Sequence, residues 1–212
     1  MGVRPGLIVD WGGVLTTDVF AAFRDFCAAE GLEPDAVRNR FAGDPRGFEL
    51  LAELECGRLA EAEFEAGFAA LLGVGPGGLI DRLFGAVLPD PAMLDGVRAA
   101  RRAGIRTALL SNSWGQDRYD RADWPELFDA WVISGEVGLR KPDPAIYPIA
   151  AERLGLEPQA CVFVDDLPGN LKPARALGMA TVLHRDAERT LAELEELLGV
   201  ALSRASRGRR GA

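Results

Sequence analysis

Residues 161–166 read Cys161-Val162-Phe163-Val164-Asp165-Asp166, a short apolar run that ends in two adjacent acids. Such a run is typical of a buried strand in a parallel sheet, where ligands bind outside the carboxyl ends of the strands. Three more apolar runs end before polar residues: Leu7-Ile8-Val9 before Asp10, Thr107-Ala108-Leu109-Leu110 before Ser111-Asn112, and Trp131-Val132-Ile133 some way before Lys141. Together the four runs predict an active site as well as a fold.

The order of helix and strand patterns predicts the fold class. From Pro91 onward a helical pattern and a strand pattern alternate four times with short linkers, which favours right-handed crossover units and an α/β, Rossmann-like parallel sheet. Near the end we expect a strand at 160–164, a helix from about Gly169 to Leu177, and a last helix with Asp186 as its N-cap and Gly199 after its end.

A long segment without any strand pattern follows the first strand. Between Asp18 and Leu88 apolar residues recur every three or four positions, and Glu61 to Leu72 is a clear amphipathic helix. We therefore predict a core domain of residues 1–17 and 89–202, a small helical cap of residues 18–88 inserted after strand one, and a basic flexible tail of residues 203–212.

The composition is that of a globular protein, because 48% of the 212 residues are hydrophobic and 26% are charged. No apolar stretch approaches the roughly 18 residues that a membrane span needs, and the segment before the first strand has no room for a secretory signal. We expect a cytoplasmic protein without a membrane partner. The net charge is −8, and since residues 203–212 hold four arginines and no acid, the rest carries −12 and predicts no nucleic-acid partner. A monomer and a homodimer both stay open.

Asp165 and Asp166 predict a metal site. Two like charges at the end of a strand repel each other unless a cation or protons neutralise them. Carboxylate oxygens suit Mg²⁺, which leaves room for water and for the phosphate oxygens of a substrate. Asn170 could orient one of the carboxylates without binding the metal itself. The alternative is a surface turn with solvated acids.

Asp10 and Lys141 are the candidates for the chemical step. Asp10 follows a buried strand and is soon followed by two glycines, so a ligand can approach its carboxylate closely and the carboxylate could act as a nucleophile. An Asp in such a place also serves as a turn or cap residue. Lys141 stands before Pro142, and its ammonium could balance the charges of a nucleophile and a phosphate, although most lysines are simply solvated.

Four other residues are candidates for binding a substrate. Ser111 and Asn112 offer hydroxyl, amide and backbone donors to phosphate oxygens, although alone they read as a turn. Trp11 and Trp114 are adjacent to proposed site residues and are candidates for the rim of a pocket. Eight of the ten phenylalanines lie between Phe20 and Phe84 and could form an apolar wall for a lipid-like or aromatic ester, but we favour packing within the cap as their role.

The order of these residues, with an insert after the first strand, resembles the four motifs of the haloacid dehalogenase-like hydrolase superfamily. The resemblance covers nearly the whole chain. Two longer stretches, 107–114 and 162–179, are similar to the phosphatase domain at the N-terminus of soluble epoxide hydrolase, and the second is quite specific. Since there is no room for the epoxide-opening domain of that bifunctional protein, only the phosphatase half is expected.

The resemblance implies a Mg²⁺-dependent phosphatase that acts on a small organic phosphate ester. Asp10 would attack phosphorus and form an aspartyl-phosphate, which splits hydrolysis into two easier steps. The resemblance also implies that Mg²⁺ is held by the Asp10 carboxylate, the Gly12 carbonyl and Asp166, with Asp165 outside the direct ligands. Ser111 and Asn112 would bind the transferring phosphoryl group, and Lys141 would reduce the repulsion between the two anions.

Gly12 departs from the family pattern. Family phosphatases usually place a second Asp two residues after the nucleophile, as a general acid for the leaving group, and a glycine cannot transfer a proton. Another acid such as Asp18 could substitute, or the leaving groups could need no help. Two alternatives therefore stay open: a hydrolytic 2-haloacid dehalogenase, against which Asp165 and Asp166 argue, and a phosphate-binding or partner-binding protein with weak or no turnover.

Overall fold

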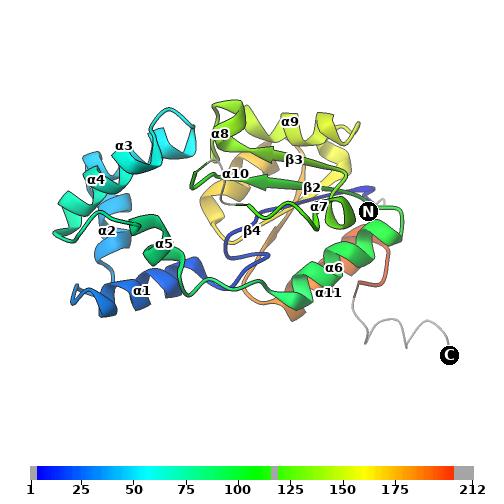
Figure 1. Cartoon of the computed structure of the whole chain (residues 1–212). Coiled ribbons are helices and arrows are strands. Elements are labelled where there is room, and N and C mark those ends of the chain that lie inside the picture. The colour runs from blue at the N-terminus through cyan, green and yellow to red at the C-terminus, as the bar shows by residue number, and fades with distance from the viewer. Residues whose placement is uncertain (1–3, 116–118, 203–212) are drawn as a thin grey trace.

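The computed structural model describes residues 4–115 and 119–202, and at its centre lies a five-stranded parallel sheet with the strand order β3-β2-β1-β4-β5 (Figure 1). The α/β fold predicted from the sequence is confirmed. In chain order the elements are β1 (Gly6–Val9), α1 (Val19–Ala29), α2 (Ala36–Gly43), α3 (Pro45–Glu55), α4 (Glu61–Leu72), α5 (Leu79–Phe84), α6 (Pro91–Arg102), β2 (Arg106–Ser111), α7 (Trp124–Leu127), β3 (Ala130–Ile133), α8 (Ser134–Val137), α9 (Ile146–Arg153), a 3₁₀ turn η1 (Pro158–Ala160), β4 (Cys161–Asp165), α10 (Pro168–Ala176), β5 (Ala180–Leu183) and α11 (Ala187–Leu198).

Strand β1 is the central strand and is buried along its whole length. Gly6 pairs with Arg106 of β2 on one side and with Cys161 of β4 on the other, so the three strands begin level with one another. Successive side chains of a strand point to opposite faces. Leu7 therefore packs against α6 and α11, whereas Ile8 packs against α9 and α10. Burial on both faces explains the unbroken apolar runs in the sequence.

The predicted element boundaries differ from the observed ones by a single residue where they differ at all. The strand expected from residue 160 begins at Cys161, because Pro158–Ala160 form the 3₁₀ turn. The Asp186 side chain caps α11 by accepting from the Arg189 N–H at 2.9 Å, and Gly199 follows the helix with a φ of 70°. The predicted tail, residues 203–212, lies outside the described residues.

Helices α1 to α5 form a separate group beside the sheet, on the left of Figure 1. They share a hydrophobic core of their own in which Phe64 and Phe68 of α4 are fully buried. Helix α4 has the bounds predicted from its amphipathic pattern, and Gly73 ends it in the left-handed region with a φ of 75°. Within the described residues no strand lies between Asp18 and Leu88, as predicted.

Two connecting segments join this group of helices to the sheet, and they run side by side. Thr16 and Pro89 form an antiparallel bridge, the Thr17 N–H donates to the Leu88 carbonyl at 2.8 Å, and the Asp90 N–H donates to the Leu15 carbonyl at 2.9 Å. The chain therefore leaves β1 and returns to α6 through one narrow, hydrogen-bonded pair of segments.

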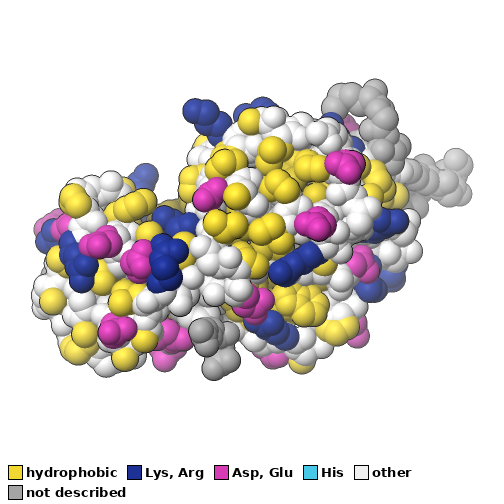
Figure 2. All heavy atoms as spheres, turned by 90° about the horizontal axis from the view of Figure 1, so that it is seen from above, with side chains coloured by type: hydrophobic (Ala, Val, Ile, Leu, Met, Phe, Trp, Pro, Cys, Tyr) yellow, Lys and Arg dark blue, Asp and Glu magenta, His cyan; other side chains and the backbone are white. Residues whose placement is uncertain are grey.

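The surface mixes charges of both signs. Figure 2 shows Lys and Arg side chains interspersed with Asp and Glu over the face that it displays. Among residues 4–115 and 119–202 none of the helices has both the length and the apolar character that crossing a membrane would require.

Candidate active site

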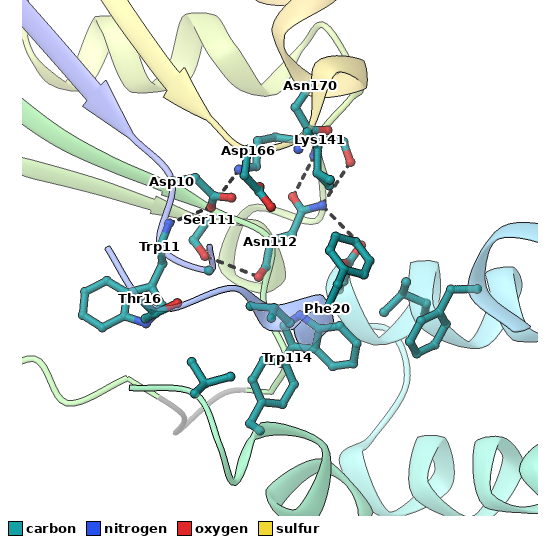
Figure 3. Close-up of a pocket in the computed structure, with 18 of the residues that line it drawn as sticks. Asp10, Trp11, Thr16, Phe20, Ser111, Asn112, Trp114, Lys141, Asp166 and Asn170 are labelled. Atoms are coloured by element: carbon teal, nitrogen blue, oxygen red, sulfur yellow. Dashed lines mark hydrogen bonds and ion pairs between the residues drawn. The ribbon is translucent and has the colours of Figure 1, made fainter. Parts of the chain in front are cut away.

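The polar ends of the predicted strands meet at one cavity of about 740 Å³. Asp10 follows β1, Ser111 ends β2 and Asp165 ends β4, and these three strands are neighbours in the sheet. Lys141 reaches the same place from the loop between α8 and α9 (Figure 3). Of the candidates named from the sequence, the fully buried Asp165 and the substitute acid Asp18 do not line the cavity. The others do: Asp10, Trp11, Gly12, Ser111, Asn112, Trp114, Lys141, Asp166 and Asn170.

Lys141 is almost completely buried, yet it is charged, because two carboxylates surround its ammonium. Its Nζ lies 2.8 Å from Asp10 Oδ1 and 2.7 Å from Asp165 Oδ2. Burial alone would lower the pKa of Lys141, but the attraction of Asp10 and Asp165 outweighs it and raises the pKa above its ordinary value. The ammonium therefore stays protonated and joins the ends of β1 and β4.

Asp10, Asp165 and Asp166 form the one group of acids in the described residues that could hold a metal ion, with one oxygen of each within 4.8 Å of the others. Burial raises the pKa of Asp10 to about 7, and burial followed by repulsion from Asp165 raises that of Asp166 to about 6. The single ammonium of Lys141 thus does not neutralise all three carboxylates. Three hard oxygen donors with surplus charge fit Mg²⁺.

Asp165 is already satisfied by protein donors. Besides Lys141, the Leu167 N–H donates to its Oδ1 at 2.8 Å, and the Asn170 amide lies 3.0 Å from Oδ1 and 3.1 Å from Oδ2. Asn170 thus has the orienting geometry that the sequence suggested. Since both oxygens of Asp165 are occupied, Asp10 and Asp166 are the freer carboxylates for a cation.

Gly13 lets the chain pass close to Asp166. Its φ is 71°, and a Cβ atom there would lie 2.7 Å from Asp166 Oδ2. At Gly12 the space is less restricted, because a Cβ would meet only Val19 Cγ2, at 3.2 Å. Asp18, which we considered as a substitute acid, caps α1 by accepting from the Phe20 N–H at 2.8 Å and lies 3.6 Å from Arg24. It does not line the cavity.

The Asn112 side chain is occupied within the protein. Its Oδ1 accepts from the Lys141 N–H at 2.8 Å, and its Nδ2 donates to the Lys141 carbonyl at 3.0 Å and to Glu55 Oε2 at 3.3 Å. The amide therefore fastens the Lys141 loop to the end of β2. A phosphate would have to be met by other groups of this segment, such as Ser111 Oγ.

Three polar residues that contact the predicted site residues or their neighbours in the chain were not predicted from the sequence. Tyr119 lies 2.9 Å from Ser111 through its hydroxyl, and burial raises its pKa well above the ordinary value, so the phenol is neutral. Glu55 comes from α3 and is buried against Arg140, with which it forms an ion pair. Arg140 stands next to Lys141, which could have drawn attention to it.

The wall opposite the acids is apolar and comes mainly from the helices of residues 18–88. Phe23 is buried, and the centroid of its ring lies 5.9 Å from that of Trp114. The Trp114 ring also packs against Phe84, with 4.8 Å between the ring centroids. Trp11 instead packs on the sheet side, where its ring centroid lies 6.0 Å from that of Tyr119. The apolar lining includes Val19, Phe20, Phe23, Phe41, Phe48, Leu51, Ile80, Phe84, Val87, Leu88 and Trp114. The two roles considered for the phenylalanines, packing within the helices and lining the cavity, therefore do not exclude each other, since Phe23 has both.

Comparison with known proteins gives consistent matches. The family model for haloacid dehalogenase-like hydrolase matches residues 5–178. The chain is similar to bifunctional epoxide hydrolase 2 of Sus scrofa, with 40% identity over 117 residues, which are 52% of this chain and 21% of that protein. It is also similar to a sesquiterpene phosphatase of Aspergillus oryzae, with 29% identity over 119 residues, which are 54% of this chain and 60% of that protein.

A solved structure has the same fold. It is a haloacid dehalogenase family enzyme of Bacteroides thetaiotaomicron in complex with magnesium and inorganic phosphate, with a TM-score of 0.63, 23% sequence identity, and coverage of 87% of this chain and 95% of that chain. The match to the epoxide hydrolases covers a smaller part of those proteins, only about a fifth of their length.

Proposed function

This chain belongs to the haloacid dehalogenase-like hydrolases, and from that premise we propose that it is a Mg²⁺-dependent phosphatase that works through an aspartyl-phosphate. The observation that carries the proposal is the arrangement of three residues: Asp10 and Asp166 follow the adjacent strands β1 and β4, and Lys141 reaches them from the loop between α8 and α9. An ammonium and a group of carboxylates suited to a cation are what an anionic nucleophile needs to approach an anionic ester.

Asp10 is the proposed nucleophile. Its Oδ1 is held by the Trp11 N–H at 2.7 Å and by Lys141 Nζ at 2.8 Å, so Oδ2 faces no donor among the described residues. Attack of Oδ2 on phosphorus forms the Asp10–phosphate bond while the bond to the leaving oxygen breaks, and water then attacks phosphorus and releases inorganic phosphate. Asp10 is regenerated in the second step.

Asp10, Asp166 and the Gly12 carbonyl would hold Mg²⁺, with Asp165 behind them. When bound there, Mg²⁺ would neutralise negative charge on the nucleophile and on the phosphoryl oxygens. Lys141 favours the ionised form of Asp10 and orients it, and Ser111 with its Tyr119 partner offers hydroxyl donors to the phosphoryl oxygens. Asp10, Lys141 and Ser111 are held by hydrogen bonds before the substrate arrives, which is the preorganisation that such stabilisation requires.

The leaving group is the weakest part of this machinery. Gly12 stands where family phosphatases usually have their acid, and Asp18 is engaged at the start of α1. We propose that the proton for the leaving oxygen comes from solvent or from the substrate, so that the rate depends steeply on the pKa of the leaving alcohol.

The substrate that we propose is a phosphate monoester with an apolar organic group. Residues 1–17 and 89–202 would supply the chemistry, and residues 18–88 would bind the organic group with aromatic side chains such as Phe20, Phe23 and Phe84. A cavity of about 740 Å³ with one polar end and one apolar wall suits such an amphiphile. The similarity to a sesquiterpene phosphatase supports the same choice.

The test is phosphate release from a panel of esters with and without EDTA. The panel contains p-nitrophenyl phosphate, glycerol 3-phosphate and an isoprenoid monophosphate. We expect release that Mg²⁺ restores after EDTA, with the lowest KM for the isoprenoid ester. Halide release from 2-haloacids without metal would favour the dehalogenase, and phosphate or ester binding without turnover would favour the binding protein.

A further inference from the structure

Glu55 is a buried acid that the proposed reaction does not use. It is the last residue of α3, only 5% of its surface is exposed, and its carboxylate faces residues of the sheet side of the cavity. A buried carboxylate is costly unless it is paired and hydrogen-bonded. Its partners therefore indicate what it does.

The first partner of Glu55 is the Asn112 amide, at 3.3 Å. The same amide binds both backbone groups of Lys141, through Oδ1 at 2.8 Å and through Nδ2 at 3.0 Å. An amide NH₂ group has two hydrogens, and here one goes to the Lys141 carbonyl while the other goes to Glu55. Glu55 thus completes the set of bonds that keeps Asn112 in the orientation that holds Lys141.

The second partner is Arg140, which forms an ion pair with Glu55 and immediately precedes Lys141. Burial raises the pKa of Glu55 to about 7, while Arg140 acts in the opposite direction and favours the charged form. Glu55 is therefore tied to the Lys141 backbone from two sides, through Asn112 and through the neighbouring side chain.

The backbone around Glu55 is anchored as well. The Ser134 hydroxyl donates to the Glu55 carbonyl. Gly57, with a φ of 70°, passes so close to α8 that a Cβ there would lie 2.5 Å from the Gly135 carbonyl oxygen. These contacts fix the end of α3 against the residues that follow β3, so the carboxylate of Glu55 has a defined position.

We propose that Glu55 is a positioning residue, supplied by the helical segment, that holds the Lys141 loop so that the ammonium stays between Asp10 and Asp165. The effect on turnover rests on the proposed phosphatase function, whereas the effect on the loop does not. The seating of residues 18–88 on the sheet domain is thereby linked to the chemistry, because α3 must be in place for Asn112 and Arg140 to be satisfied.

The experiment compares Glu55→Gln with a matched control on the same helix. Glu53 also pairs with an arginine, Arg58, at 2.7 Å, but the pair is at the surface and does not line the cavity. With p-nitrophenyl phosphate we expect Glu55→Gln to lower kcat about 10- to 100-fold, as for other residues that act through a catalytic group, with KM within about twofold. Glu53→Gln should change neither constant by more than about twofold.

A second readout needs no activity: hydrogen exchange of the Lys141 N–H, followed by NMR in both variants. We expect Glu55→Gln, but not Glu53→Gln, to speed this exchange by at least about tenfold while the amides of β1 and β4 stay protected. Unchanged exchange at Lys141, or unchanged kcat in an active wild-type enzyme, would overturn the inference. If the wild type releases no phosphate but the exchange increases as expected, the proposed function fails and the positioning role stands.

Discussion

The two sides of the cavity are built in different ways. On the sheet side, the functional groups stand at strand ends or in loops, and most are held by hydrogen bonds or ion pairs, as Lys141 is by Asp10 and Asp165. On the other side, the side chains are apolar and come from helices, and several are exposed at the mouth, such as Phe48 at 54% and Leu88 at 62%.

If the proposed function holds, the difference means that the chemistry and the choice of substrate are separated in this molecule. On the polar side a displacement should be costly, because Asn112, Lys141 and Asp165 each satisfy another buried group. The apolar side has no such directional bonds and can accept different organic groups at modest cost. Substitutions on the two sides should therefore differ in size and in the kinetic constant that they change.

The largest effect is expected for Asp10→Asn. The amide cannot attack phosphorus, so phosphate release should fall by at least about a thousandfold, while circular dichroism and Tm show an intact fold. Removing a buried carboxylate whose pKa is raised to about 7 should not destabilise the protein at neutral pH. Undiminished activity in this variant would remove the nucleophile assignment.

The two adjacent acids should behave differently when replaced. Asp166→Ala should lower activity about 10- to 100-fold and raise the Mg²⁺ concentration needed for half-maximal activity. Asp165→Asn should also lower activity, because it weakens the hold on Lys141, but it should shift the Mg²⁺ titration much less. Equal shifts in both titrations would contradict the division of roles between the two carboxylates.

Gly12→Asp should raise the activity on esters with poor leaving groups, because it adds the acid that family phosphatases usually have at this position. The backbone there needs no left-handed conformation, and a Cβ meets only Val19 at 3.2 Å, so the variant should fold after a small shift of that side chain. We expect about a tenfold gain on alkyl phosphates and little change on p-nitrophenyl phosphate, whose leaving group needs no proton. A preserved fold with no gain on alkyl esters would show that proton transfer does not limit the rate.

Stability should depend on pH and on metal. Because the pKa of Asp10 rises from 3.8 to about 7 on folding, the folded protein keeps a proton that the unfolded chain releases in this range. The stability from this group is therefore present below pH 3.8 and is lost as pH rises through about 7. In EDTA we expect Tm to fall by a few degrees between about pH 5.5 and about pH 8.

Mg²⁺ supplies the charge that the proton otherwise supplies, so it should reduce this fall in Tm. Asp10→Asn without metal is the control and should show a smaller pH dependence than the wild type. A wild-type Tm that rises over the same pH range in EDTA would contradict the assignment.

The smallest effect is expected at the mouth of the apolar side. Leu88→Ser removes an exposed apolar side chain but keeps the backbone bond from the Leu88 N–H to Thr17 Oγ1, at 3.0 Å. KM for an isoprenoid monophosphate should rise about two- to fivefold, while the constants for p-nitrophenyl phosphate stay the same. An equal loss on both esters would mean that this wall does not select the organic group.

Much of the sheet side could be predicted from the sequence, because two simple regularities combine there. Strands buried on both faces leave unbroken apolar runs such as Val162–Val164, and parallel strands bring their carboxyl ends to one edge. Asp10, Ser111 and Asp165 therefore fall together once the sheet is recognised. The group of helices was equally visible, since its apolar residues recur at helical spacing.

The residues that link the two sides could not be predicted in this way. Glu49, Glu53 and Glu55 all lie on α3, and only the packing of that helix beside the sheet makes the last of them a buried partner of Asn112. The contact between Tyr119 and Ser111 depends on how the chain brings Tyr119 back to the end of β2, and no local sequence pattern indicates it. A helical pattern also cannot separate the face of Phe23 that packs from the face that lines a cavity.

The paired segments at Thr16 and Pro89 have a consequence for how such a protein can change. Because these segments are bridged, the two ends of the inserted group of helices lie next to each other. The helices between Thr16 and Pro89 could therefore be replaced without changing the distance that the connection between β1 and α6 must span. A different set of helices grafted at these two positions would leave the proposed nucleophile, Asp10, in its place. New selectivity is thus reachable by swapping one module, provided that it brings an acid able to occupy the place of Glu55.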